Sequence, residues 1–378
     1  MALGAPIFPR SSMRDIQQFD GGFPSFSQPQ EVGCFSLSRR DDQRRQYHDD
    51  ARALKPLVRR GPGPVVTHLN INLDQGMDVF IDHKQEYKMT EHLEFLLQWI
   101  AHHPTEFNKL RSKIQMVCWR GKLHELLTTP YDRQNGWILC VCKIDGILYM
   151  SSFENRNHES RRLSETKKDR TFMYWGFKFE QYMTNQPDDE KEFRKPVDNF
   201  ESFQTVLFSR LKNTGILYGA EMDCYDPEVG TEKAPDRYVE LKTARNIENN
   251  RQYQNFCNHK LMKFWAQSFI AGVPLIVVGF RNDYGRVSST EEIPTQSISR
   301  RVRENGQPWL PNICANFLAD FLLFVRQIAV EEYDKAIYRF EWNPGAEKIA
   351  CTVEAPDSAW KFIPDWYMEA RPKSAKAL

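Results

Sequence analysis

Two short segments of the sequence carry acidic residues and a lysine at alternating positions, a pattern suited to metal-dependent chemistry. One segment contains Glu221 and Asp223, and the other contains Glu240 and Lys242. Alternate side chains of a β-strand point to the same face, so each pair would project together if both segments are strands. Pairing of the two strands would then bring three carboxylates and one ammonium group onto a single patch.

Carboxylates that lie close together raise one another's pKa values unless a cation stands between them. Carboxylate oxygens without nearby Cys or His ligands favour Mg²⁺ or Mn²⁺, and such a site suits phosphoryl-transfer or phosphodiester chemistry. Charged pairs with this spacing also arise by chance in a chain that is 27% charged. The spacing alone therefore leaves open a metal-dependent nuclease and an ordinary acidic surface.

The composition indicates a folded protein without a general affinity for polyanions. The chain has 378 residues, of which 41% are hydrophobic and 13% aromatic, and this is ample material for a core. A formal net charge of +1 does not indicate a generally basic nucleic-acid-binding protein, although a local basic patch can still form. The eight cysteines show no zinc-ligand spacing, which favours free thiols in a reducing compartment.

Nothing in the sequence predicts membrane association. The N-terminus lacks the pattern of a secretory signal. The longest apolar stretch, residues 269–280, is broken by Gly272 and Pro274 and is too short to span a bilayer. We therefore expect an intracellular, soluble protein with no membrane partner.

Hydrophobic periodicity and turn residues predict one domain of class α+β (mixed α/β), with mixed β-sheets flanked by helices. We expect an extended N-terminal arm at residues 1–30, a domain at 31–368 and a short tail at 369–378. The predicted helices cover 89–103 with Thr90 as cap, 171–184, 200–212, 251–272 and 310–331. The predicted strands are a hairpin over 137–152 and the segments 216–224, 237–243, 274–281, 337–342 and 349–354. A charged surface insertion is expected at 184–198.

Five short motifs occur in the order in which they are found in the decapping and exoribonuclease (DXO) family. They are Trp119-Arg120-Gly121, Gly176-Phe177-Lys178-Phe179-Glu180, Glu221-Met222-Asp223, Glu240-Leu241-Lys242 and Trp265-Ala266-Gln267-Ser268-Phe269. Each motif is weak by itself, but the ordered set, within a resemblance that runs from about residue 31 to 368, is specific.

The resemblance implies an enzyme of RNA 5′-end quality control in the nucleus or the cytoplasm. Members of the family hydrolyse incomplete or non-standard caps, and several act on NAD caps. Some also remove pyrophosphate from 5′-triphosphate RNA or degrade RNA from 5′ to 3′. Fungal members bind a separate 5′–3′ exoribonuclease, and the fold is similar to that of metal-dependent nucleases.

The resemblance also implies which residues form the site. The metal ligands match Glu180, Glu221, Asp223, Glu240 and the main-chain carbonyl of Leu241, and they would hold Mg²⁺ or Mn²⁺, with two ions expected. Catalytic roles extend to Lys242 and Gln267. The substrate contacts match Arg45, Glu91, Trp119, Arg120, Gly121, Gln204, Glu221, Lys242 and Gln267. Mammalian relatives carry Cys at the position of Gln204, which puts that contact in doubt.

Two other classes of function stay open at this level. A catalytically silent relative could bind RNA ends or a partner protein, but such a relative should have lost acidic ligands that this chain retains. A DNA nuclease could use the same two acidic pairs, and only the wider set of motifs favours RNA ends. Basic clusters could line an RNA path, although runs of charge are usually solvated surface; they lie at 44–45, 59–60, 161–162, 167–168 and 300–303.

Overall fold

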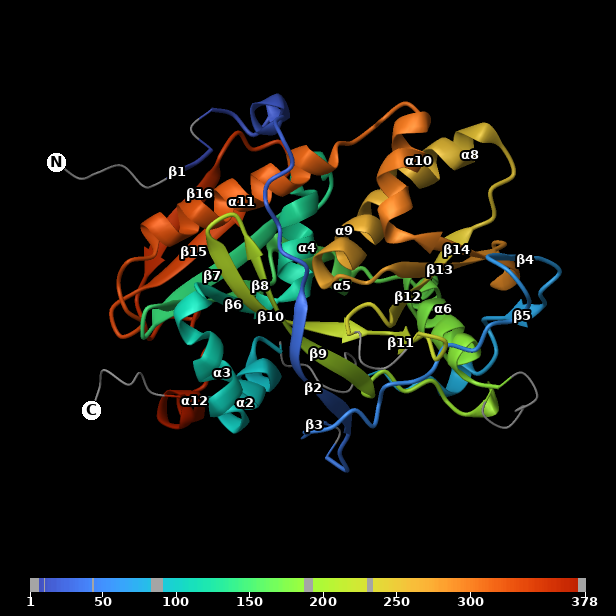
Figure 1. The fold of residues 1–378 in the computed structure, drawn as a ribbon, viewed down its shortest axis with the longest axis horizontal. Helices are drawn as coiled ribbons and strands as arrows, with labels where there is room; N and C mark the ends of the chain where they lie inside the picture. The colour runs from blue at the N-terminus through green and yellow to red at the C-terminus, as the bar shows by residue number, and fades with distance from the viewer. Residues whose placement is uncertain are drawn as a thin grey trace.

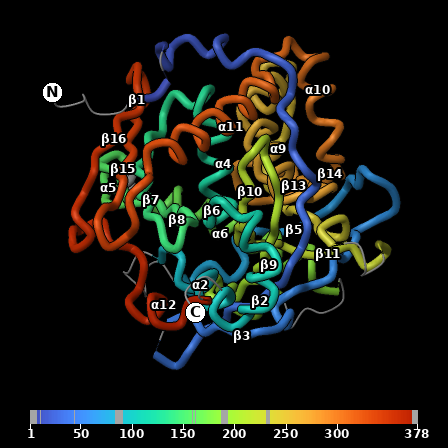
Figure 2. The backbone as a smooth tube through the Cα atoms, turned by 60° about the vertical axis from the view of Figure 1, so that its left-hand side comes forward, coloured from blue at the N-terminus to red at the C-terminus, as the bar shows by residue number. Residues whose placement is uncertain are grey.

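Two mixed β-sheets of unequal size form the framework of the protein (Figures 1 and 2). The computed structural model describes residues 7–9, 11–42, 44–82, 91–186, 193–229 and 234–372, except for the side chains of residues 158 and 161. The predicted mixed α/β architecture is confirmed. Thr90 and part of the predicted insertion at 184–198 lie outside the described residues.

The larger sheet, sheet A, contains ten strands among the described residues. In spatial order they are β1 (Ile7–Phe8), β16 (Ile349–Glu354), β15 (Ile337–Trp342), β7 (Trp137–Ile144), β8 (Ile147–Phe153), β6 (Met116–Trp119), β10 (Thr214–Met222), β9 (Ser202–Leu211), β2 (Gln30–Arg39) and β3 (Arg45–His48). Strand β6 runs parallel to both of its neighbours, and the other pairs are antiparallel.

The smaller sheet, sheet B, lies beside sheet A and carries the second acidic pair. Its strands are β11 (Cys224–Tyr225), β12 (Tyr238–Arg245), β13 (Leu275–Arg281), β14 (Arg286–Pro294), β4 (Val65–Val66) and β5 (Ile71–Asn72). Strands β12 and β13 are parallel, and α9 (Leu261–Ala271) lies in the connection between them. Such a crossover is the usual way to join parallel neighbours.

Helices cover both faces of each sheet. The other α-helices of the described residues are α2 (Glu94–His102), α3 (Pro104–Leu110), α4 (Arg120–Thr128), α5 (Arg156–Leu163), α6 (Lys167–Thr184), α8 (Asn250–Asn255), α10 (Ile298–Glu304), α11 (Pro311–Ile328) and α12 (Asp365–Ala370). The largest apolar core joins α4, α9 and α11 to one face of sheet A and one face of sheet B. Helices α2 and α12 cover the opposite face of sheet A, and α6 covers the opposite face of sheet B.

The N-terminal segment lies along this framework. Strand β1 pairs with β16, and a 3₁₀ turn at Ile16–Phe19 follows it. The rings of Phe8 and Phe19 are buried against Phe317 of α11, at centroid distances of 5.9 and 5.3 Å. The arm therefore contributes apolar contacts to the main core. The division of the chain at residues 30 and 368 stays a prediction.

Local sequence signals account for most of the element ends. Thr166 and Asp169 form a reciprocal capping box that starts α6 at Lys167, earlier than the predicted start at residue 171. The turn Asp145-Gly146 joins β7 to β8 as predicted, with both residues at positive φ. The predicted helix at 251–272 consists of α8, a π-helical turn at Phe256–Lys260, and α9.

The predicted helix at 200–212 is wrong, because this segment forms β9. Phe203, Leu207 and Leu211 recur every four residues, which matches a helical stripe, but residues four apart also share one face of a strand. The strand lies between β10 and β2, and nine of its ten residues are buried. Burial on both faces removes the alternation that usually identifies a strand.

No helix in the described part of the chain has both the length and the apolar composition needed to cross a bilayer. All eight cysteines are free thiols, as the sequence predicted.

Candidate active site

The two acidic segments meet where the chain passes from sheet A to sheet B. Strand β10 ends at Met222 in sheet A, and β11 begins at Cys224 and pairs with Val239 of β12 in sheet B. Asp223 is the single residue between them. Among the described residues, the two predicted acidic segments therefore pair only at Cys224 and Val239, since β10 and β12 belong to different sheets and the crossing brings Asp223 to β12.

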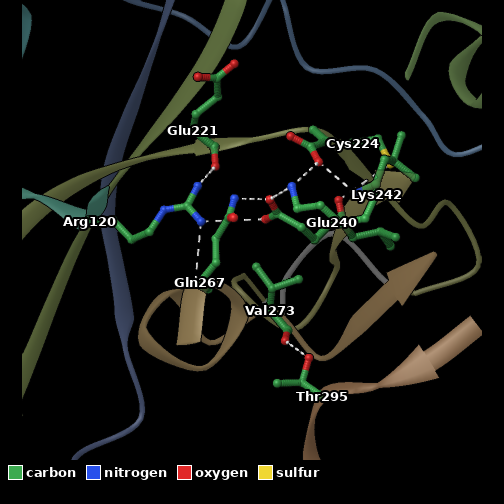
Figure 3. Close-up of polar contacts among 11 residues, drawn as sticks. Arg120, Glu221, Cys224, Glu240, Lys242, Gln267, Val273 and Thr295 are labelled. Atoms are coloured by element: carbon green, nitrogen blue, oxygen red, sulfur yellow. Dashed lines mark hydrogen bonds and ion pairs between the residues drawn. The ribbon is translucent and has the colours of Figure 1, made fainter. Parts of the chain in front are cut away.

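Lys242 lies between the carboxylates of Asp223 and Glu240, and Figure 3 shows its contact with Glu240. Its Nζ atom is 2.5 Å from Glu240 Oε1 and 3.8 Å from Asp223 Oδ2. The same Asp223 oxygen accepts a 2.7 Å hydrogen bond from the Leu241 N–H. Glu240 and Lys242 thus project together from one strand, as the alternation predicted.

The Glu240 carboxylate is 1% exposed, and only one of its two oxygens has a hydrogen bond. The Gln267 amide on α9 donates to Oε1, which also accepts from Lys242. Oε2 is buried without a hydrogen-bond partner, and its ion-pair contact with Arg120 Nη1 spans 3.8 Å. An ionised oxygen left in this state is costly unless a ligand completes its environment.

The carboxylates of the cluster outnumber the cations beside them, and the pKa values of two of them are raised. Burial raises the pKa of Asp223 to about 7, and the charge of Glu240 adds to the rise. Burial also raises the pKa of Glu180 well above its usual value, with further contributions from Asp223 and Glu221. Burial opposes ionisation of Glu240 as well, but Lys242 and Arg120 outweigh it and lower its pKa.

The other predicted metal-ligating side chains lie around the Asp223–Lys242–Glu240 cluster but do not converge on one position. Glu180 lies on α6, and the Glu221 side chain points away from Glu240 in Figure 3. No three Asp, Glu, His or Cys side chains within the described ranges converge closely enough to hold an ion as placed. The donor set nevertheless fits a hard divalent cation, because it consists of carboxylate oxygens, one of them without a partner.

Two cavities meet at the carboxylates. The first, of about 350 Å³, is lined by eight of the nine predicted substrate contacts: Arg45, Glu91, Trp119, Arg120, Gly121, Gln204, Glu221 and Gln267. The second, of about 380 Å³, is lined on one side by Glu180, Glu221 and Asp223. Glu221 lines both cavities, so the carboxylate cluster lies at their junction. The ninth predicted contact, Lys242, lies in the cluster itself.

Arg120 is fixed at the floor of the first cavity. It is the first residue of α4, is 7% exposed, and donates to the main-chain oxygens of Glu221 at 3.0 Å and Gln267 at 3.5 Å. The preceding Trp119 packs so closely on Gly219 of β10 that a Cβ there would come within 2.3 Å of the ring. Glycine at 219 is therefore required for this packing. A Cβ added to Gly121 would meet no atom within 4 Å, so the cavity is open at this residue.

The other predicted substrate contacts interact with one another across the cavity wall. Arg45 on β3 pairs with Glu91 at 3.3 Å and donates to the Asn199 carbonyl at 2.9 Å. Gln204 lies directly opposite Glu221 in the β9–β10 register and donates to Ser202 Oγ at 3.1 Å. Because α2 begins only at Glu94, Glu91 precedes the helix and acts as an ion-pair partner.

His124 also lines the first cavity but is not among the site residues predicted from the sequence. It follows Arg120 by one helical turn on α4, so the i, i+4 spacing was the available signal. Burial, together with the charges of Arg120 and Lys263, lowers its pKa to about 4, and its Nε2 atom has no hydrogen-bond partner. The imidazole is therefore neutral at pH 7.

Several of the basic clusters seen in the sequence are engaged in ion pairs and do not form an open basic surface. Arg59 contacts Asp226, Glu228 and Glu292. Arg301 pairs with Glu291 at 2.7 Å, and Arg162 pairs with Glu154 at 2.8 Å. The Arg161 side chain lies outside the described residues.

A nuclease is the class of protein that this fold and this cluster define, and the comparisons with known proteins agree. The chain belongs to the family of RAI1-like PD-(D/E)XK nucleases, whose model matches residues 27–368. Within that range, Glu240-Leu241-Lys242 has the residue types and spacing of the (D/E)XK part of the family name.

Named relatives and solved structures extend over almost the whole chain. The chain is 39% identical to the human decapping and exoribonuclease protein over 362 residues, which cover 94% of this chain and 88% of the relative. It resembles Candida albicans Rai1 in complex with pU5 and Mn²⁺, with a TM-score of 0.78, 21% identity and coverage of 98% and 99%. It also resembles Scheffersomyces stipitis Rai1 in complex with (3′-NADP)⁺ and a calcium ion, with a TM-score of 0.74, 20% identity and coverage of 92% and 96%.

Proposed function

We propose that this chain is a metal-dependent hydrolase of RNA 5′ ends that removes incomplete or non-canonical caps, including NAD caps. The observation that carries the proposal is the buried Asp223–Lys242–Glu240 cluster at the junction of two cavities in a chain of this nuclease family. The name of the human relative, and the pU5 and (3′-NADP)⁺ ligands of the two fungal structures, support RNA 5′ ends as the substrate class.

We assign the ligand role to Glu180, Glu221, Asp223, Glu240 and the Leu241 carbonyl, with Mg²⁺ or Mn²⁺ as the metal and two ions as the expected number. The fungal structures contain Mn²⁺ or Ca²⁺, which supports a divalent ion. When bound, such ions activate water and stabilise the developing charge on the phosphate oxygens.

The protein residues then position the substrate and the scissile phosphate. Lys242 supplies an ammonium group beside that phosphate, and its raised pKa, due mainly to Glu240 and opposed by burial, keeps it charged. Gln267 contacts the same Glu240 oxygen and can orient a water or a phosphate oxygen. Arg120 is held by two main-chain carbonyls and presents a fixed cation to the 5′-terminal group in the first cavity.

A panel of RNAs tests this proposal. Transcripts that differ only in the 5′ end (unmethylated cap, NAD cap, triphosphate or monophosphate) are incubated with Mg²⁺ or Mn²⁺, and the released products are identified by mass. Release of an intact cap fragment or pyrophosphate supports decapping, and stepwise loss of nucleotides adds 5′–3′ exonuclease activity. No hydrolysis of any end with either metal would favour the alternative, a silent RNA-end-binding protein.

Binding of a separate exoribonuclease and a nuclear or cytoplasmic location stay predictions of the family resemblance.

A further inference from the structure

Two lysines without acidic partners among the described residues lie at the start of α9, the helix that carries Gln267. Lys260 ends the π-helical turn that precedes α9, and Lys263 lies in the first turn of α9. Lys260 and Lys263 are both exposed, and no carboxylate of the described residues forms an ion pair with either. Partial burial of the ammonium group lowers the pKa of Lys260, and the neighbouring charges of Lys263 and Arg281 lower it further. Among the described residues, these two lysines therefore lack the acidic partners that Arg59 and Arg301 have.

Helical spacing places these lysines on a path that leads to the active site. Lys260, Lys263 and Gln267 are separated by three and four residues, so they share one face of the helix over about 10 Å. Gln267 lines the first cavity, and the charge of Lys263 reaches His124 in the same cavity. Figure 1 shows α9 running from α8 towards α4 at the centre of the molecule.

A separate cavity lies at the other end of this path. It has a volume of about 420 Å³, and Arg245, Asn246, Asn255, Phe256, His259 and Lys260 are among its lining residues, which include no acid. Arg245 pairs with Asp283 at 2.5 Å, so Lys260 is the lysine or arginine of this lining that has no acidic partner among the described residues. Arg245 ends β12, three residues after Lys242, so the cavity is connected to the catalytic cluster by a strand as well as by the helix. Amide and aromatic groups beside cations suit a nucleobase with its phosphate.

We propose that the exposed face formed by the π-helical turn at Phe256–Lys260 and the start of α9 binds the single-stranded body of the RNA substrate, with backbone phosphates on Lys263 and Lys260 and a nucleotide in the cavity lined by Arg245 and Lys260. This inference rests on the proposed function and adds to it a second binding region outside the 5′-end site. Contacts of this kind are to phosphates, so they are independent of sequence and depend on salt. The region would act only on substrates long enough to reach it.

Substrate length tests the inference. The variant K260A/K263A is compared with the wild type on a 5′-triphosphate dinucleotide and on a 20-nucleotide RNA with the same 5′ end. We expect kcat/KM to fall about tenfold on the long RNA and to stay unchanged on the dinucleotide. The logarithmic salt slope of long-RNA binding should decrease by about 1.4, since each lost contact to a single strand contributes about 0.7.

Matched variants control for general charge effects. K335A/K361A removes two exposed lysines that pair with Glu331 and Asp365, and it should leave both substrates unaffected. K260R/K263R keeps both charges and should retain long-RNA activity. An equal loss on both substrates, or no loss on either, would overturn the inference.

RNA binding by this face can be tested separately from the proposed hydrolysis of RNA 5′ ends. Binding of the 20-nucleotide RNA, followed by fluorescence anisotropy without added metal, requires no turnover. If the wild type hydrolyses neither substrate, the proposed function fails, and the anisotropy of K260A/K263A still decides whether this face binds RNA. Unchanged affinity and an unchanged salt slope in that variant would refute the RNA-binding face even in an active enzyme.

Discussion

Two aspartates three residues apart show opposite electrostatic behaviour. Asp226 accepts hydrogen bonds from Arg59 at 3.0 and 2.7 Å, and this guanidinium holds the pKa of Asp226 below its usual value. Burial and Glu240 instead raise the pKa of Asp223 to about 7. The same short segment therefore contains one acid whose charge a guanidinium stabilises and one whose charge is opposed by burial and a neighbouring carboxylate. The group of Arg59, Asp226 and Glu292 is called the satisfied cluster here, and the group of Asp223, Lys242 and Glu240, in which Glu240 Oε2 has no hydrogen-bond partner, the unsatisfied cluster.

The difference lies in the cations available to each aspartate. Arg59 offers a planar fork that fits the Asp226 carboxylate and a third donor for Glu292 at 2.8 Å, so that cluster is complete. Around Asp223, the single ammonium group of Lys242 is shared with Glu240, and Glu180 adds further negative charge. Buried acids that share a single ammonium group and keep an unpartnered oxygen are better candidates for ligand binding than acids that each accept a hydrogen bond from a guanidinium.

Removal of two carboxylates from the unsatisfied cluster should have the largest effect. The rate of hydrolysis by the variant E221A/D223A should be at least about 1,000-fold lower than that of the wild type, because both carboxylates would stabilise the same transition state. Its Tm without metal should be equal to or higher than that of the wild type, since repulsion between carboxylates is relieved. Turnover of a 5′-triphosphate RNA and thermal unfolding in EDTA measure the two quantities.

The control for this variant removes two acids that are exposed to solvent. E304A/D357A deletes two exposed carboxylates outside the cluster and should keep full activity. Retained turnover in E221A/D223A would exclude the proposed site.

Lys242 is the cation that both acids share, and its loss should affect rate more than binding. We expect Lys242→Ala to lower kcat about 100-fold and to weaken RNA affinity by less than about threefold, as befits a group that acts on the transition state. Single-turnover kinetics over a series of enzyme concentrations measure the rate of the chemical step and the RNA affinity separately. A loss confined to affinity would count against this role.

Divalent ions should stabilise the unsatisfied cluster and leave the satisfied one unchanged. Mn²⁺ at 100 times its Kd should add about 2.7 kcal/mol to the free energy of unfolding of the wild type. The gain should disappear in E221A/D223A and persist in E304A/D357A, as measured by thermal shift over a series of Mn²⁺ concentrations. An equal shift in all three proteins would indicate ion binding elsewhere.

The sequence predicted the members of the site better than their arrangement. Ordered motifs identified Arg120, Gly121 and Gln267, and the structure brings these residues together around one cavity. The alternation in Glu240-Leu241-Lys242 was sufficient to place two side chains on one face of a strand. These signals are local, so they could be read without knowledge of the tertiary structure.

The features that could not be predicted depend on contacts distant in the sequence. The crossing between sheets at Asp223 depends on the pairing of Cys224 with Val239, which no local pattern specifies. Burial on both faces of β9 conceals the period of the strand, so the sequence predicts a helix there.

Disruption of the satisfied cluster should affect stability and leave chemistry unchanged. Arg59→Gln leaves Asp226, whose side chain is 9% exposed, without its cation. We expect a loss of about 1–2 kcal/mol in the free energy of unfolding at pH 7, below the roughly 3–5 kcal/mol of a fully buried pair because Arg59 is 27% exposed. Activity per folded molecule should be unchanged, which would also exclude Arg59 from an RNA path.

The pH dependence of this loss gives the sharper test. The folded-state pKa of Asp226 is lowered, so its contribution is complete above the unfolded pKa of about 3.9 and is lost as pH falls through the lower folded value. The difference in unfolding free energy between wild type and Arg59→Gln should therefore be constant from pH 7 to pH 5 and shrink below about pH 4. Urea unfolding at several pH values measures it. A difference that persists unchanged at the lowest pH would mean that Arg59 stabilises the fold through packing and not through the charge of Asp226.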